Sequence, residues 1–174
     1  MATRRKKKGS AKSVKPKVSA RPAKKAAKAP ARRAPAKALA TDAIVQEVTL
    51  PAGPRVVWDA YLDAERHARF TGSGAAIDRR VGGRFRAYDG YIEGVILELA
   101  PPNGETGRLV QSWRASDFPP EYPHSTVEIV VAPAGRGTKL TLRHTGVPRA
   151  MVSAFAKGWQ DFYWAPLKKM LRAK

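Results

Sequence analysis

One long amphipathic helix is predicted at the end of the sequence, after a run of short alternating segments. Its large apolar residues recur at helical spacing and form one stripe: Met151, Phe155, Trp159, Phe162 and Tyr163. Another element of the fold must cover such a stripe. Because the preceding segments alternate between apolar and polar residues, we predict that this element is an antiparallel sheet.

Turn signals divide the sheet region into strands, and Asp89-Gly90 is the strongest hairpin signal among them. The predicted strands cover residues 42–50, 84–88, 91–99, 108–114, 127–131 and 140–144. Two short helices are predicted between the first two strands. Pro148 is placed in the first turn of the last helix, and Pro166 predicts a kink within it.

Residues 1–41 differ sharply in composition from the rest of the chain. They hold 15 of the 33 Lys and Arg residues, no acidic residue and no aromatic residue. The other 18 basic residues lie among all 14 acidic residues, so most of the net charge of +19 belongs to this segment. A segment with so little apolar surface cannot offset its chain entropy. We therefore predict a disordered basic tail over 1–41 and one α+β domain over 42–174.

The tail predicts sequence-independent binding to nucleic acid or other polyanions through neutralised phosphates. The missing aromatic residues argue against base stacking. Two alternatives stay open: a solubilising extension with no dedicated partner, and an organelle-targeting presequence. The residues predicted to contact phosphates are Arg4, Arg5, Lys6, Lys7, Lys8, Lys24, Lys25, Lys28, Arg32 and Arg33.

Several classes of protein are excluded or disfavoured by composition. The absence of Cys excludes disulfides, thiolate metal sites and cysteine nucleophiles. No apolar run approaches the roughly 20 residues of a membrane helix, and no apolar region of a signal peptide follows the first charges. We expect a cytoplasmic protein, associated with nucleoid or chromatin where its tail binds nucleic acid.

Catalytic chemistry has little support in the sequence. The three histidines, His67, His124 and His144, show neither the spacing of metal ligands nor a carboxylate partner. No nucleophile elbow or glycine-rich phosphate loop is present. We predict a protein that is not an enzyme and that has no metal and no cofactor.

A set of short motifs, in order over residues 43–172, carries a family resemblance. They include Gly82-Gly-Arg-Phe85, Gly90-Tyr-Ile-Glu-Gly94, Leu109-Val-Gln-Ser-Trp-Arg114, Gly137-Thr-Lys-Leu-Thr-Leu-Arg-His144 and Tyr163-Trp-Ala-Pro-Leu-Lys168. This set resembles the C-terminal-type domain of the activator of heat-shock protein 90 ATPase homologue family, in the START-like (SRPBCC) superfamily.

The resemblance implies a helix-grip fold, in which a curved antiparallel sheet wraps around the long C-terminal helix and leaves a cavity between them. Superfamily members use that cavity for lipids and other apolar ligands, or for no known ligand. A chaperone is an implied partner. However, the family's eukaryotic co-chaperones carry a separate N-terminal chaperone-binding domain, and the basic tail stands in that place here.

The cavity is predicted to be lined by large aromatic residues of the helix and by inward-facing strand residues: Trp58, Trp113, Leu142, His144, Phe155, Trp159 and Tyr163. The aromatic residues are expected to form the core as well as the lining. His144 has the strand parity of Leu142, so it should face the helix. It is interpreted either as a polar anchor for a ligand or, preferably, as a core histidine bonded to a neighbour.

Three functions follow from these observations. The favoured one is a non-enzymatic domain that binds an apolar small molecule or a protein, tethered to polyanions by its tail. The alternative is a co-chaperone or stress-related interaction module with a vestigial cavity. The third is a cyclase-like or hydrolase-like enzyme, which would require a polar dyad in the cavity with His144 as one half.

Overall fold

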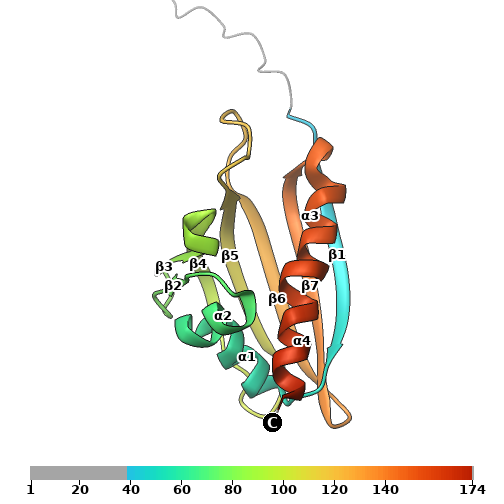
Figure 1. Ribbon diagram of the computed structural model, residues 1–174. Helices are drawn as coiled ribbons and strands as arrows, with labels where there is room; N and C mark the ends of the chain where they lie inside the picture. Colours follow the sequence, from blue (N-terminus) through green and yellow to red (C-terminus); the bar gives the residue numbers. More distant parts are fainter. Residues whose placement is uncertain (1–38, 174) are drawn as a thin grey trace, which may run out of the picture. The chain divides into compact units, whose positions relative to one another are not determined.

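One antiparallel sheet forms most of the domain, and the computed structural model describes residues 39–173 of the chain. The strand order is β1-β7-β6-β5-β4-β3-β2, so the first and last strands are neighbours (Figure 1). The strands are β1 (Thr41–Leu50), β2 (Ala76–Ile77), β3 (Arg84–Ala87), β4 (Ile92–Ala100), β5 (Gly107–Ala115), β6 (Ser125–Ala134) and β7 (Gly137–Pro148).

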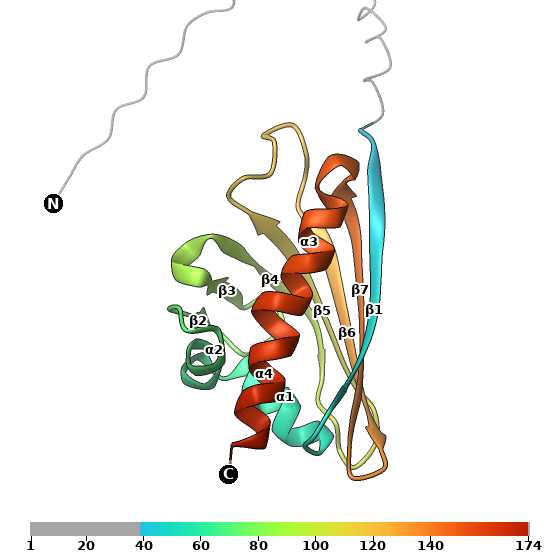
Figure 2. The ribbon, with the colours of Figure 1, turned by 45° about the vertical axis from the view of Figure 1, so that its right-hand side comes forward.

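A long C-terminal helical segment runs across one face of this sheet (Figure 2). It consists of a 3-10 turn η2 (Arg149–Met151), α3 (Val152–Gly158), a π-helical segment η3 (Trp159–Trp164) and α4 (Ala165–Arg172). The predicted α+β helix-grip architecture, a curved antiparallel sheet around one long C-terminal helix, is confirmed.

Two short helices, α1 (Pro54–Leu62) and α2 (Ala64–Thr71), follow β1 as predicted. Pro54 occupies the first turn of α1, where its missing N–H costs no intrahelical bond. The Asp63 side chain accepts a hydrogen bond from the backbone N–H of Arg66 and so caps α2. Gly72 ends α2 in the left-handed conformation. Helix α2 packs against α4, so both short helices lie at the α4 end of the long helix.

The core lies between the sheet and the long helix. Alternate residues of β6 and β7 are buried, including Ile129, Leu140 and Leu142. On the helix, Trp159 and Leu167 are buried at a spacing that keeps them on the sheet side. Alternating burial in the strands and one buried stripe on the helix are the patterns that such a two-layer packing requires.

The C-terminal helix differs from the prediction at Phe162. This side chain is 61% exposed, whereas Trp164 is buried. The π-helical turns from Trp159 to Trp164 contain more residues per turn than an α-helix, so the buried stripe changes its phase there. Phe162 therefore turns away from the core and stands at its edge.

The predicted disturbance at Pro166 takes the form of this π-helical segment in the turn that precedes it. Gln46 of β1 links the sheet to the helix at this segment through two hydrogen bonds. Its Nε2 donates to the carbonyl of Ala156 at 2.7 Å, and its Oε1 accepts from the indole of Trp164 at 2.8 Å. Pro148 was predicted in the first helical turn, but β7 continues through it and it ends the strand.

Most of the predicted basic tail lies outside the described residues, including every residue from Arg4 to Arg33 that was predicted to contact phosphates. Strand β1 begins at Thr41. Within residues 39–173, no helix is long and apolar enough to cross a membrane.

Candidate functional site

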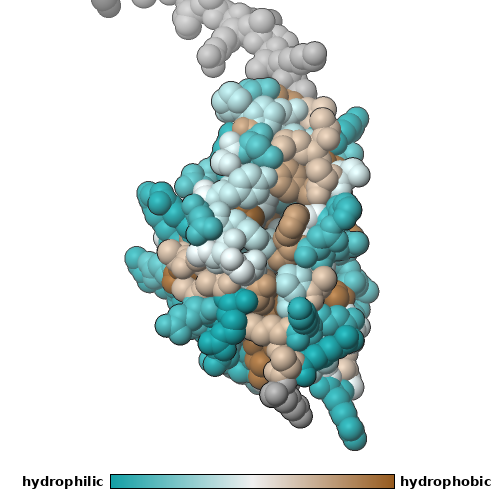
Figure 3. All heavy atoms as spheres, in the orientation of Figure 1, coloured by the Kyte–Doolittle hydropathy of each residue, from teal (hydrophilic) through white to brown (hydrophobic). Residues whose placement is uncertain are grey.

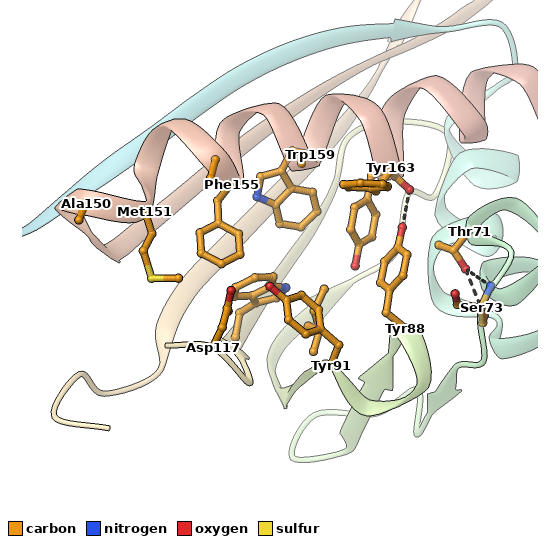
Figure 4. A pocket seen from close by; sticks show the side chains of 15 residues that line it. Thr71, Ser73, Tyr88, Tyr91, Asp117, Ala150, Met151, Phe155, Trp159 and Tyr163 are labelled. Carbon is orange, nitrogen blue, oxygen red and sulfur yellow. Dashed lines mark hydrogen bonds between the residues drawn. The ribbon is translucent and has the colours of Figure 1, made fainter. Parts of the chain in front are cut away.

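An open pocket with a volume of about 530 Å³ lies beneath the α3 end of the long helix (Figure 4). In the space-filling view, hydrophobic residues gather along the middle of the face that Figure 1 shows, with hydrophilic residues on both sides (Figure 3). The pocket is lined by Thr71, Ser73, Tyr88, Tyr91, Ile92, Trp113, Asp117, Ala150, Met151, Ala154, Phe155, Gly158, Trp159, Phe162 and Tyr163.

The helix contributes two kinds of residue to this pocket. Ala150, Ala154 and Gly158 follow one another at four-residue spacing and all line it. The neighbouring positions carry the large side chains Met151, Phe155 and Trp159. Because the small residues leave their side of the helix without bulk, space remains between the helix and the strands. The sequence prediction used the large residues and missed the small ones, whose regular spacing was the available signal.

The floor of the pocket comes from the indole of Trp113 on β5. Its ring centroid lies 5.4 Å from that of Phe155 and 6.0 Å from that of Trp159. Phe118 packs against Trp113 and Phe155 from the loop after β5. These edge-to-face and tilted contacts are favourable arrangements for aromatic rings, and they fix the shape of the apolar wall.

A strained turn between β3 and β4 presents two tyrosines to the pocket. Tyr88 and Asp89 have positive φ angles of 53° and 55°, which non-glycine residues rarely adopt. The Asp89 carboxylate accepts the backbone N–H of Gly74 at 3.0 Å and so supports the turn. Strained backbone of this kind often marks a functional site. Here it directs Tyr88 toward the helix and places Tyr91 beside Asp117 (Figure 4).

Both tyrosines have raised pKa values. Burial raises the pKa of Tyr88, whose hydroxyl donates to the backbone carbonyl of Phe162. Burial, followed by a hydrogen bond to Asp117, raises the pKa of Tyr91 to about 12. Both phenols are therefore neutral at physiological pH and act as hydrogen-bonding groups at the pocket edge.

The other end of the helix–sheet interface has almost no free space. A second cavity of only about 10 Å³ lies there, next to Tyr61, His67, Gln111 and Tyr163. The Nδ1 of His67 lies 2.8 Å from the carbonyl of Tyr61 and donates to it, and burial lowers the pKa of this histidine. A cavity of this size holds at most one water and is too small for a ligand.

His144 belongs to a buried network beneath the helix. Ser125 donates its hydroxyl hydrogen to the carbonyl of Trp113 at 2.7 Å. The Nε2 of His144, 2.8 Å from that hydroxyl oxygen, must therefore be the donor to Ser125. Its Nδ1 accepts from the indole of Trp159 at 3.1 Å. Burial lowers the pKa of His144 to about 3, so the ring is neutral.

The Ser125–His144 contact therefore cannot act as a nucleophile and its base. The histidine donates to the serine, whereas a general base must accept the serine proton. The indole of Trp159 occupies the nitrogen that a carboxylate would orient in a catalytic triad. Within residues 39–173, no cluster of three or more His, Cys, Asp or Glu residues is placed to hold a metal.

Four of the seven predicted cavity residues line the large pocket: Trp113, Phe155, Trp159 and Tyr163. The other three are buried in the core and do not line it: Trp58, Leu142 and His144. Trp58 lies on α1, which belongs to the packed end, and His144 is held by Ser125 and Trp159. The prediction missed the polar edge formed by Tyr88, Tyr91 and Asp117, because it depends on a loop and a turn from different parts of the chain.

A curved sheet around a C-terminal helix, with an open pocket between them, defines a START-like domain. Residues 51–172 match the family described as Activator of Hsp90 ATPase homolog 1-like protein, and the chain belongs to this family. The family predicted from the sequence motifs is thus confirmed.

Two similar proteins are named as activators of the 90 kDa heat shock protein ATPase. The chain is 30% identical over 103 residues to the mouse activator of 90 kDa heat shock protein ATPase homolog 2, covering 59% of this chain and 30% of the relative. It is 25% identical over 126 residues to the human homolog 1, covering 72% and 36%. The chain thus spans about a third of the length of these relatives.

Solved structures show the same fold. An HSP90 activator from Plasmodium falciparum superposes with a TM-score of 0.64 at 28% identity, covering 76% of this chain and 96% of that one. CalU16 from Micromonospora echinospora gives 0.58 at 30% identity, covering 75% and 79%.

Proposed function

We propose that this domain binds an apolar small molecule in the pocket beneath α3 and does not transform it. The observation that carries the proposal is the open, aromatic-lined volume of about 530 Å³ at that position. Ligand sites of proteins are typically clefts of about 300–1,000 Å³, lined by apolar side chains with a few polar groups. The pocket has both properties, with its polar groups at Tyr91 and Asp117.

The residues around the pocket support binding rather than catalysis. The raised pKa values keep the tyrosines protonated, so no phenolate is available as a base, and His144 is committed to the Ser125–Trp159 network. In the described part of the chain, the lining residues include no histidine, lysine or arginine that would act as a proton donor or acceptor. The dyad with His144 as one half, which a cyclase-like or hydrolase-like enzyme would require, is therefore not formed in this pocket.

The test is to fill the pocket from the helix. Ala154 and the adjacent Ser153 are both exposed, but only Ala154 lines the pocket. We expect a neutral fluorescent probe, N-phenyl-1-naphthylamine, to bind the full chain saturably. The Ala154→Phe variant should weaken that binding roughly tenfold, which corresponds to about 1.4 kcal/mol. Ser153→Phe adds the same ring outside the pocket and should bind normally.

Two results would contradict the proposal. One is the absence of saturable probe binding to the unmodified chain. The other is equal binding by both variants, which would place the probe elsewhere. Circular dichroism and the thermal midpoint of each variant check that the fold is retained.

We further propose that the basic tail over residues 1–41 tethers the domain to nucleic acid, in the nucleoid or chromatin. Support comes from its 15 Lys and Arg residues and the absence of acids. Replacing the cluster Arg4 to Lys8 by five glutamines in the full chain should lower the slope of log K against log salt by about 0.9 for each phosphate that is no longer neutralised. Arg143→Gln, on the domain surface, is the control. An unchanged slope would refute the tether.

A chaperone is a second candidate partner, favoured by the heat-shock names of the relatives that the domain matches. In this alternative the domain contacts an Hsp90-type chaperone and the pocket is vestigial. A saturable change in the ATPase rate of such a chaperone on addition of the full chain would favour it, in particular if Ala154→Phe gave the same change.

A further inference from the structure

The pocket lining has an unusual balance of charge. Asp117 is the one charged residue among the fifteen that line it in the described part of the chain. Residues 42–174 contain 18 Lys and Arg against 14 Asp and Glu, so basic residues are in excess. Their absence from the pocket lining therefore does not follow from composition.

Within the described residues, the Asp117 carboxylate also has no basic partner. Among residues 39–173 no ion pair includes it, whereas Asp59, for comparison, pairs with both Arg55 and Arg79. Arg114 lies three residues before Asp117, but its guanidinium donates to backbone carbonyls of the loop that follows, including that of Phe118 at 3.1 Å. The exposed Asp117 carboxylate lies beside the neutral phenol of Tyr91, which brings no positive charge to offset it.

Aromatic rings surround the space that this carboxylate faces. Seven of the lining residues are aromatic: Tyr88, Tyr91, Trp113, Phe155, Trp159, Phe162 and Tyr163. The faces of aromatic rings carry partial negative charge and attract cations within about 6 Å. Tyr91 and Phe162 are 40% and 61% exposed, so rings of this set are accessible from solvent.

We propose that the pocket is selective for organic cations: its ligand carries an ammonium group on an apolar or aromatic body. The ammonium group pairs with Asp117 next to the aromatic faces, and the apolar body lies against Trp113, Phe155 and the small residues of the helix (Figure 4). This inference rests on the proposed binding function and names the chemical class of its ligand.

The same arrangement disfavours anionic ligands. A carboxylate or phosphate in this pocket would meet the Asp117 charge and the negative faces of the rings, and no lining Lys or Arg of the described residues would compensate it. Fatty acids and phosphorylated ligands should therefore bind less well than amines of the same size.

Three naphthalene probes of nearly equal size test the inference: 1-naphthylmethylamine, 1-naphthalenemethanol and 1-naphthoic acid. Titration calorimetry with the full chain at pH 7 and 0.15 M salt measures their affinities; at this ionic strength exposed charges are screened beyond about 8 Å. We expect the amine to bind about tenfold more tightly than the alcohol, and the acid to bind most weakly.

The variants separate a local effect from a global one. Asp117→Asn should lower the affinity for the amine about tenfold, to the level of the alcohol, and leave the alcohol unchanged. Glu105→Gln makes the same change in net charge, but it precedes β5, whereas Asp117 follows the opposite end of that strand. This control should retain the preference for the amine.

The outcomes are distinguishable. If the alcohol binds but the amine shows no advantage, or if Asp117→Asn weakens both probes equally, the cation inference is wrong while the binding function stands. If none of the three probes binds, the proposed function itself fails.

Discussion

The two ends of the long helix face the same sheet, yet one end is packed and the other is open. At the α4 end, Leu167 is fully buried and a cavity of about 10 Å³ remains. At the α3 end, the pocket measures about 530 Å³. The helices α1 and α2 account for the difference, because they follow β1 and occupy the space beside α4 (Figure 1).

One helix therefore combines a structural role at one end with a candidate site at the other. Where α1 and α2 supply side chains, the helix carries large residues such as Trp164 and Leu167. At the α3 end, where α2 contributes only its last residue Thr71, the helix carries Ala150, Ala154 and Gly158 toward the pocket. Stability is therefore expected to depend on the packed end, and ligand binding on the open end.

The largest expected effect comes from matched truncations at the two ends. Leu167→Ala removes a fully buried side chain and should lower the free energy of unfolding by about 3 kcal/mol, within the range for core leucines. Met151→Ala, on the partly exposed pocket wall, should cost about 1 kcal/mol or less. Urea unfolding followed by circular dichroism measures both.

Equal reductions in stability would refute the contrast between the ends. Probe binding gives the reverse comparison: Met151→Ala should alter the affinity for N-phenyl-1-naphthylamine, and Leu167→Ala should leave it unchanged below the unfolding transition.

The next effect concerns the boundary between the ends, where His144 is buried as a neutral ring with its pKa lowered to about 3. The unfolded chain, with a histidine pKa near 6.5, binds a proton that the folded state excludes. The stability gained by burying His144 as a neutral ring is thus fully present above pH 6.5. It is lost as the pH falls from 6.5 toward 3. Between pH 7.5 and 4.5 the loss in unfolding free energy should be about 3 kcal/mol.

His144→Gln should flatten the fall in stability over this pH range by that amount, whereas His124→Gln, at an exposed position, should not. An NMR titration of the unmodified protein gives an independent reading. A His144 imidazole that protonates near pH 6.5 in the folded state would contradict the buried network.

The sheet and the C-terminal helix were predictable because their signals are local. Alternation in residues 127–131 and 140–144 corresponds to β6 and β7, and the apolar stripe marks the helix. The two-residue β2 escaped prediction because so short a strand has no periodicity. The exposure of Phe162 was not predicted either. The buried stripe of the helix changes its phase there because Gln46 and Pro166 alter the hydrogen bonding of the helix backbone.

The candidate site was predictable only on its helix side. Phe155, Trp159 and Tyr163 follow from the stripe. Tyr91 and Asp117 lie 26 positions apart and meet through the pairing of Ile92 with Ala115 in β4 and β5, a register that no local pattern specifies. His144 faces the helix as its strand parity indicates, but neighbouring side chains, and not a ligand, satisfy both of its ring nitrogens.

The smallest effect tests how Tyr88 joins the β3–β4 turn to the helix. In a regular α-helix, the carbonyl of Phe162 would accept the N–H of residue 166, but this residue is proline and has none. The Tyr88 hydroxyl donates to that carbonyl instead. Tyr88→Phe should therefore cost about 1 kcal/mol of unfolding free energy, the usual net value of such a bond.

Pro166→Ala supplies the missing N–H, so the two substitutions should be coupled. In the Pro166→Ala background, Tyr88→Phe should cost about 0.5 kcal/mol less than in the unmodified chain, as measured by a double-mutant cycle. Tyr122→Phe removes a hydroxyl that donates to the carbonyl of Ala40 and should show no coupling to Pro166. Additive costs for Tyr88 and Pro166 would mean that the tyrosine holds the pocket edge through its ring contacts with Phe162 and Tyr163, and not through the orphaned carbonyl.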